Sequence, residues 1–86
     1  MNYGLSFSRR AANYFERLDR RTQERMRDAL TELLRDPEGP PGKPLQGTSQ
    51  RSLRVGGWRI IFFVSHTDEI VYVDAIAPRG EVYRGL

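Results

Sequence analysis

The sequence predicts an α+β fold, in which two N-terminal helices pack on one face of a small, mainly antiparallel four-stranded sheet, in the order β-α-α-β-β-β. Three observations support this prediction. An alternating apolar pattern opens the chain, two stretches with helical periodicity follow, and the only long apolar runs lie in residues 52–77, interrupted by short turns. Because the chain has 86 residues, we expect one domain that spans residues 1–86.

The first strand and the first helix are predicted from residues 3–18. Residues 3–7 alternate apolar with small side chains, which is the period of a half-buried strand. Ser8 is the expected N-cap of a helix that runs from Arg9 to about Leu18. The apolar positions of this helix form one stripe: Ala11, Tyr14, Phe15 and Leu18. So short a helix is unstable alone in water, so we expect the stripe to pack on the sheet.

A second helix begins after Asp19 and the two arginines that follow it, and it extends to Arg35, with Thr22 as its expected N-cap. Its expected buried stripe contains five residues: Met26, Ala29, Leu30, Leu33 and Leu34. The outer faces of both helices carry mixed charges, which indicates a solvated surface. Residues 36–47 contain four prolines and three glycines, so we expect a connector without regular structure.

Residues 52–77 predict a three-stranded antiparallel meander. Residues 52–55 and 58–65 are the first two strands, and Gly56 and Gly57 form the turn between them, since glycine suits the positive φ angles of such turns. Residues 66–69 turn the chain again, and residues 70–77 form the third strand, which Pro78 ends. His66, the one histidine, is therefore expected in a turn about 20 Å from Arg59.

Strand pairing across the glycine turn brings two arginines together. If Val55 pairs with Trp58, then Arg54 lies directly opposite Arg59. Like charges in this arrangement destabilise a strand pair unless an anion, a carboxylate or solvent offsets the repulsion. The second turn is expected to set Asp74 opposite Ile61, one diagonal step from Arg59. Two alternatives therefore stay open, an anion site and a salt-bridged surface.

The predicted sheet has one face toward the helices and one partly open face. The expected open face carries Ser52, Arg54, Arg59, Ile61 and Asp74, whereas the opposite face carries Trp58, Ile60, Phe62 and Val64. The third strand ends near the glycine turn because it runs antiparallel to the second. We therefore expect Arg79 and Tyr83 to emerge beside the two arginines of the turn.

Composition limits the function classes. The net charge is +3 with a pI of about 9.8, and Lys43 is the only lysine among 14 basic residues. Arginine has a planar fork suited to phosphate, although a GC-rich genome would give the same bias. The absence of cysteine excludes disulfides, and with a single histidine we expect no metal and no cofactor. We expect a cytoplasmic protein with no membrane partner, because no apolar run is long enough for a span or a signal peptide.

Three segments of the chain resemble the RelE/ParE superfamily of bacterial toxins from type II toxin-antitoxin systems, and the RelE-like branch in particular. They are residues 43–47, residues 53–64 (LRVGGWRIIFFV) and residues 77–85 (APRGEVYRG). The resemblance implies a ribosome-dependent endoribonuclease, or mRNA interferase, that cuts messenger RNA in the decoding site and inhibits translation. It implies metal-independent cleavage by attack of a 2′-hydroxyl group.

Roles carry over where positions match. The resemblance implies that Arg59 and Arg79 stabilise the phosphate, and that Tyr83 acts on the 2′-hydroxyl or stacks on a base. It implies RNA binding by other basic residues: Lys43, Arg51, Arg54 and Arg84. An arginine keeps its proton at working pH, so the general base is Tyr83, Glu81 or Asp74.

The chain also departs from the pattern, and two other functions stay open. Gln50 and Ser52 stand where well-studied RelE toxins have lysines, and Gly57 and Trp58 replace an aspartate and a tyrosine. One alternative is a ParE-like inhibitor of DNA gyrase. The other is a catalytically silent co-repressor that binds operator DNA with its antitoxin. All three functions share a cognate antitoxin as partner, and the nuclease adds the ribosome and messenger RNA.

Overall fold

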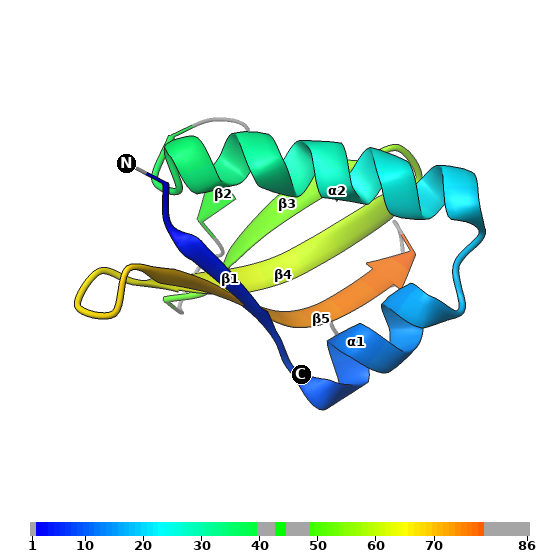
Figure 1. Cartoon of the computed structure of the whole chain (residues 1–86), viewed down its shortest axis with the longest axis horizontal. Coiled ribbons are helices and arrows are strands. Elements are labelled where there is room, and N and C mark those ends of the chain that lie inside the picture. Colours follow the sequence, from blue (N-terminus) through cyan, green and yellow to red (C-terminus); the bar gives the residue numbers. More distant parts are fainter. Residues whose placement is uncertain (1, 40–42, 45–48, 79–86) are drawn as a thin grey trace.

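A computed structural model describes residues 2–39, 43–44 and 49–78. The chain forms one mixed sheet with strand order β1-β5-β4-β3-β2, in which β1 is parallel to β5 and the other pairs are antiparallel (Figure 1). The elements are β1 (Gly4–Phe7), α1 (Arg9–Glu16), α2 (Arg20–Arg35), β2 (Lys43–Pro44), β3 (Arg51–Val55), β4 (Trp58–Ser65) and β5 (Ile70–Pro78). The predicted α+β fold and its order of helices and long strands are confirmed.

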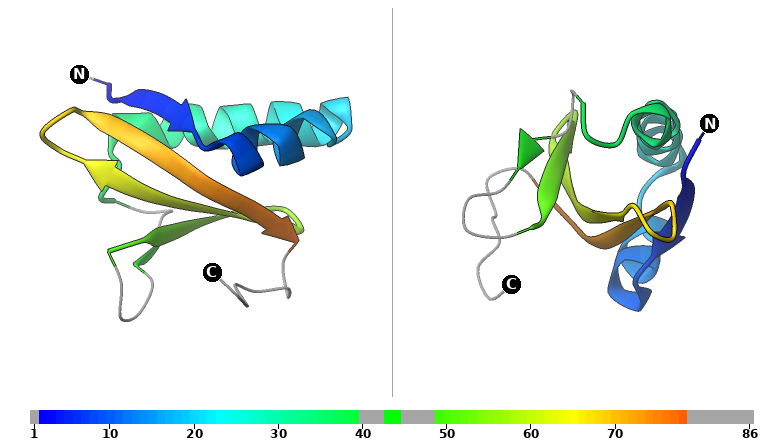
Figure 2. Two further views of the ribbon diagram at one scale, coloured as in Figure 1. Left: turned by 90° about the horizontal axis from the view of Figure 1, so that it is seen from below. Right: turned by 90° about the vertical axis from the view of Figure 1, so that its left-hand side faces the viewer.

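Both helices lie on the same side of the sheet, as the two views of Figure 2 show. Their apolar stripes and one face of the meander form a single core: Ala11, Met26, Leu30, Leu33, Leu53, Val55, Ile60, Phe62, Val71, Val73 and Ile76. Trp58 and Val64 pack against this core, so the predicted helix-facing side of β4 is confirmed. Arg54 and Arg59 therefore project from the other face, because side chains alternate along a strand.

The two helix starts differ in how well the sequence predicted them. The Ser8 hydroxyl oxygen accepts a hydrogen bond from the Ala11 N–H at 3.1 Å, so Ser8 caps α1 as predicted. The predicted cap of α2 is wrong, because Asp19 and not Thr22 holds that position. The Asp19 carboxylate accepts from the Thr22 N–H at 3.1 Å and from the Thr22 hydroxyl at 2.6 Å. These bonds hold the pKa of Asp19 below its usual value.

The strands joined by the glycine turn pair in the predicted register. The strands joined by the second turn pair in the predicted register only for the residues nearest that turn. Val55 pairs with Trp58, and Gly56 has a φ of +58°. Ser65 pairs with Ile70 as expected, but the register then shifts, since Phe62 pairs with Val73 and Ile61 with Ala75. Asp74 is the extra residue of this β-bulge. The predicted position of Asp74 opposite Ile61 is therefore wrong.

The connector after α2 is more regular than predicted. Lys43 and Pro44 form the two-residue strand β2, which pairs with Ser52 and Arg51 of β3. The prediction of no regular structure is therefore wrong for these two residues. Proline is compatible with this position because β2 is an edge strand and needs no donor on its outer side. In the described ranges, neither helix has the length and apolar content that a membrane crossing requires.

Candidate functional site

Two arginines face each other at the turn end of the sheet. Arg54 of β3 pairs directly with Arg59 of β4, as the sequence predicted. Both project from the face away from the helices, since their neighbours Leu53, Val55 and Ile60 lie in the core. Two cations fixed at this spacing repel each other, so the arrangement favours binding of an anion between them.

A third arginine reaches the glycine turn from the helical layer. The guanidinium group of Arg25 in α2 lies 3.6 Å from the position that a Cβ atom on Gly56 would take. We call the facing residues Arg54 and Arg59 the arginine cluster. Within the described ranges, no carboxylate forms an ion pair with Arg25 or Arg54. From the sequence, all charges on the outer helix faces are expected to be solvated, and no pattern indicates that Arg25 reaches the glycine turn.

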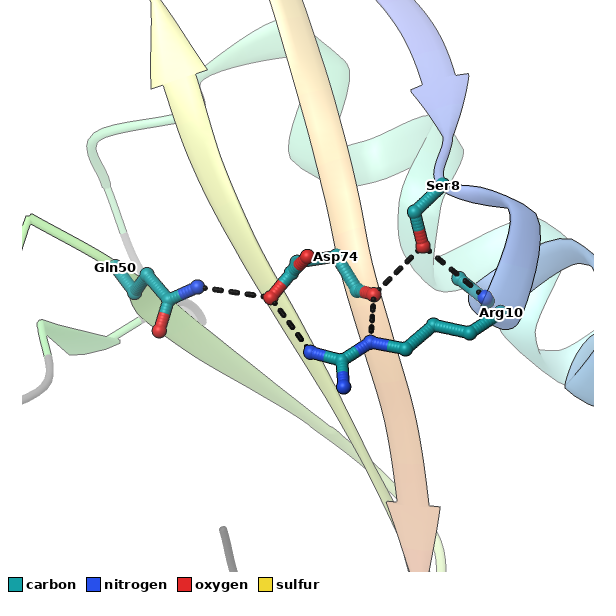
Figure 3. A network of polar contacts seen from close by, with 5 residues as sticks. Ser8, Arg10, Gln50 and Asp74 are labelled. Atoms are coloured by element: carbon teal, nitrogen blue, oxygen red, sulfur yellow. Dashed lines mark hydrogen bonds and ion pairs between the residues drawn. The ribbon is translucent and has the colours of Figure 1, made fainter. Parts of the chain in front are cut away.

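Asp74 is bound elsewhere and does not neutralise the arginine cluster. Its carboxylate accepts hydrogen bonds from Arg10 Nη2 and Gln50 Nε2, each at 3.0 Å (Figure 3). Its backbone carbonyl accepts from Ser8 Oγ at 2.7 Å and from Arg10 Nε at 3.0 Å. The β-bulge and the start of α1 are thereby joined. Asp74 is therefore a structural link, and the salt-bridged surface considered for Arg59 and Asp74 gives way to an ion pair with Arg10.

Arg51 also lies apart from the arginine cluster. It pairs with Phe62, so it belongs to the helix-covered face, and its side chain is only 14% exposed. Its Nη1 lies 3.5 Å from Glu38 Oε1, and its Nη2 donates to the Glu38 carbonyl at 3.2 Å. This arginine fastens the turn after α2 to β3. We therefore leave Arg51 out of the candidate RNA site, contrary to the expectation from the resemblance.

His66 lies in the turn between β4 and β5, as predicted. Its Nδ1 is 2.7 Å from the Tyr3 hydroxyl, and its Nε2 is 2.9 Å from Glu38 Oε2. These contacts join the turn to the chain before β1 and to the end of α2. The histidine is therefore at the end of the sheet opposite the arginine cluster, where it cannot act on a ligand held there.

The other predicted site residues fall at or beyond the limits of the described chain. Lys43 lies in β2, where its backbone pairs with Ser52. Pro78 pairs with Trp58 at the turn end, and it is the last described residue. Four predicted site residues lie outside the described residues: Arg79, Glu81, Tyr83 and Arg84. The described part of the chain contains no group of three or more side chains suited to hold a metal ion.

The comparisons with known proteins agree with this geometry. The sequence model described as "ParE toxin of type II toxin-antitoxin system, parDE" matches residues 5–83. The isolated RelE toxin of Escherichia coli has a similar structure, with a TM-score of 0.82, 23% identity and coverage of 93% of this chain and 87% of that one. No curated protein matches the sequence.

Two further solved structures are similar. The intact E. coli RelBE toxin-antitoxin complex gives a TM-score of 0.79 at 26% identity, covering 93% of this chain and 99% of that one. A YoeB/ParE toxin from Agrobacterium tumefaciens gives 0.77 at 21% identity, covering 88% and 98%. The arrangement of two helices on one sheet is thus shared with these toxins.

Proposed function

The chain belongs to the ParE toxin family of type II toxin-antitoxin systems, and from this premise we propose that it is a ribosome-dependent mRNA endoribonuclease that inhibits translation. The observation that carries the proposal is the direct pairing of Arg54 with Arg59 on the face away from the helices. Like charges placed opposite each other destabilise a strand pair, and a phosphate between the two guanidinium groups would relieve this repulsion.

The proposed reaction is an internal transfer at phosphorus. A 2′-hydroxyl loses its proton to a base and attacks the adjacent phosphate, the bond to the 5′-oxygen breaks, and that oxygen takes up a proton. Charge on the phosphate oxygens grows in the transition state, so fixed arginines stabilise it more than the ground state. We assign this role to Arg59 with Arg79, and we assign the base to Tyr83 or Glu81. Arg54, Lys43 and Arg84 would hold the RNA backbone.

This set of groups is sufficient but weak, because arginine stays protonated and a phenol is a poor base at neutral pH. A larger partner that holds the RNA in a reactive geometry would supply the missing rate. The translating ribosome is such a partner, which places the activity in the cytoplasm. Binding of the cognate antitoxin would block the same basic surface, and the resulting complex is the form expected at operator DNA.

Expression in cells with mapping of messenger RNA ends tests the proposal. Wild-type protein should arrest growth and produce cuts within codons. Arg59→Ala and Tyr83→Ala should each lower the cutting rate by about 100-fold or more, because Arg59 is assigned to the transition state and Tyr83 to the base. Arg54→Ala should lower the cutting rate by weakening RNA binding. Arg20→Ala is the matched control, because it removes an equally charged side chain from the exposed surface of α2. Full cutting by all three site variants would refute the proposed site.

A second candidate is inhibition of DNA gyrase. The family match, which is to ParE toxins, favours this function. Gln50, just before β3, and Ser52, within β3, also favour it, because both are uncharged where well-studied RelE toxins have lysines. The same expression experiment separates the two functions. Growth arrest with intact transcripts and gyrase-linked DNA breaks would establish the gyrase function and exclude the nuclease.

A further inference from the structure

Two aromatic rings are stacked on the sheet face that carries the arginine pair. Phe63 of β4 lies opposite Tyr72 of β5, with ring centroids 5.1 Å apart and ring planes at 19°. Ser6 of β1 pairs with Tyr72 and extends this row to the edge of the sheet. The Phe63 side chain is 38% exposed, although water contact with a phenyl ring is unfavourable. An exposed, ordered aromatic pair is a surface suited to a flat ligand.

The surroundings of the rings combine apolar and polar side chains. Phe63 and Tyr72 line a hollow of about 230 Å³ together with Phe7, Val73, Ser6, Ser8 and Asp74. Arg10, which is bound to Asp74 at 3.0 Å, keeps its side chain 54% exposed beside the hollow. The hollow therefore combines stacked rings with hydroxyl and carboxylate groups and a nearby cation. Nucleotides have the complementary parts, namely a flat base, polar base edges and a phosphate.

The rings also lie on the same face of β4 as Arg59. Arg59, Ile61 and Phe63 alternate along the same side of β4, so the Phe63 ring is about 14 Å from Arg59 at 3.4 Å per residue. A single RNA strand that places one phosphate at Arg59 would reach the rings with a neighbouring nucleotide. Proteins that bind single-stranded RNA on an open sheet face commonly stack bases on such aromatic side chains.

We propose that Phe63 and Tyr72 form a base-stacking subsite, which holds an unpaired nucleobase of the RNA substrate next to the nucleotide cut at the arginine cluster. This inference rests on the proposed nuclease function. Partial burial and the Asp68 carboxylate raise the pKa of Tyr72.

Binding of short RNA to the free protein tests the subsite. The probe is a single-stranded hexanucleotide that carries the fluorescent base 2-aminopurine at one position, whose emission falls when it stacks. With wild-type protein, the 2-aminopurine emission should fall strongly when the base occupies one particular position of the hexanucleotide and weakly when it occupies the others. Phe63→Ala should weaken binding by about 5-fold to 100-fold, since stacking on an aromatic side chain contributes that much. Leu5→Ala is the matched control, because Leu5 is a similarly exposed apolar residue at 40%. It lies in β1 and pairs with Val71, so its side chain is on the face of the sheet opposite the rings. The Leu5→Ala variant should bind RNA like the wild type.

Conservative variants separate stacking from folding. Phe63→Tyr keeps an aromatic ring and should retain binding within about twofold, whereas Phe63→Leu keeps the apolar bulk and should bind as weakly as Phe63→Ala. Equal binding by the tyrosine and leucine variants would refute a stacking role. A loss of antitoxin binding in Phe63→Ala, with unchanged RNA binding, would show that the rings contact protein instead and would overturn the proposal.

The cleavage assay distinguishes the two proposals. If wild-type protein cuts no messenger RNA but Phe63→Ala still loses RNA binding, the nuclease proposal fails and the base subsite stands. If wild-type protein cuts messenger RNA and Phe63→Ala binds and cuts it equally well, the subsite fails and the nuclease proposal stands.

Discussion

Replacing Gly56 with alanine should destabilise the protein by about 1–2 kcal/mol more than the same replacement at Gly57. The two glycines are neighbours in the turn that sets Arg54 opposite Arg59. Gly56 has a φ of +58°, in the left-handed region that alanine disfavours, whereas Gly57 is outside that region. The pair of variants therefore isolates the cost of one backbone conformation.

The structure shows why other contributions cancel in this comparison. A Cβ atom on Gly56 would meet the Arg25 guanidinium at 3.6 Å, an ordinary van der Waals contact, and one on Gly57 would meet nothing within 4 Å. Neither substitution creates a clash. Each also lowers the entropy of the unfolded chain by a similar amount, which stabilises the fold by about 0.4–1 kcal/mol in both variants. The difference between the variants is then the left-handed strain at position 56.

Thermal unfolding followed by circular dichroism measures the difference. For a domain of this size, 1 kcal/mol corresponds to about 4–8 °C, so the two midpoints should differ by about 4–16 °C. Gly56→Asn should lie between wild type and Gly56→Ala, because asparagine tolerates the left-handed region better. Equal midpoints for the two alanine variants, or a lower midpoint for Gly57→Ala, would refute the reasoning.

Three further outcomes are expected. Leu33→Ala should lower the free energy of unfolding by about 2–5 kcal/mol in urea titration, because Leu33 is fully buried in the core, and a loss under 1 kcal/mol would contradict that position. The bonds from Thr22 lower the pKa of Asp19 from 3.8, so the stability that they contribute is complete above about pH 3.8 and is lost as the pH falls through the folded pKa. Asp19→Asn should therefore make the melting temperature less sensitive to acid below about pH 4. An unchanged acid dependence would argue against the cap. Arg51→Met should lower the melting temperature yet leave RNA binding within about twofold, and a large loss of RNA binding with unchanged stability would return Arg51 to the RNA site.

The helices and long strands could be predicted from the sequence because their signals are local. The apolar stripes of α1 and α2 repeat at the helical period, and the glycine pair marks the turn between the first two strands of the meander. The pairing of Arg54 with Arg59 followed from counting outward from that turn. These predictions held because each needs only residues that are close in the chain.

The β-bulge at Asp74 could not be predicted in the same way. Counting from the turn after Ser65 is correct as far as Phe62, where one extra residue enters β5 and moves Asp74 out of the pairing. Arg10 and Gln50, 64 and 24 positions away in the chain, then bind its carboxylate. No local pattern indicates a bulge that distant side chains stabilise.

By itself, the sequence determined the fold class, the apolar faces of the elements and the paired arginines at the glycine turn, because each follows from periodicity or from a two-residue turn. Only the tertiary structure decided which charges meet. It brought Arg25 to the turn, fixed Arg51 on Glu38, bound Asp74 to Arg10 and stacked Phe63 on Tyr72. Charged and aromatic side chains are long and choose their partners in space, so their contacts depend on how distant elements pack together.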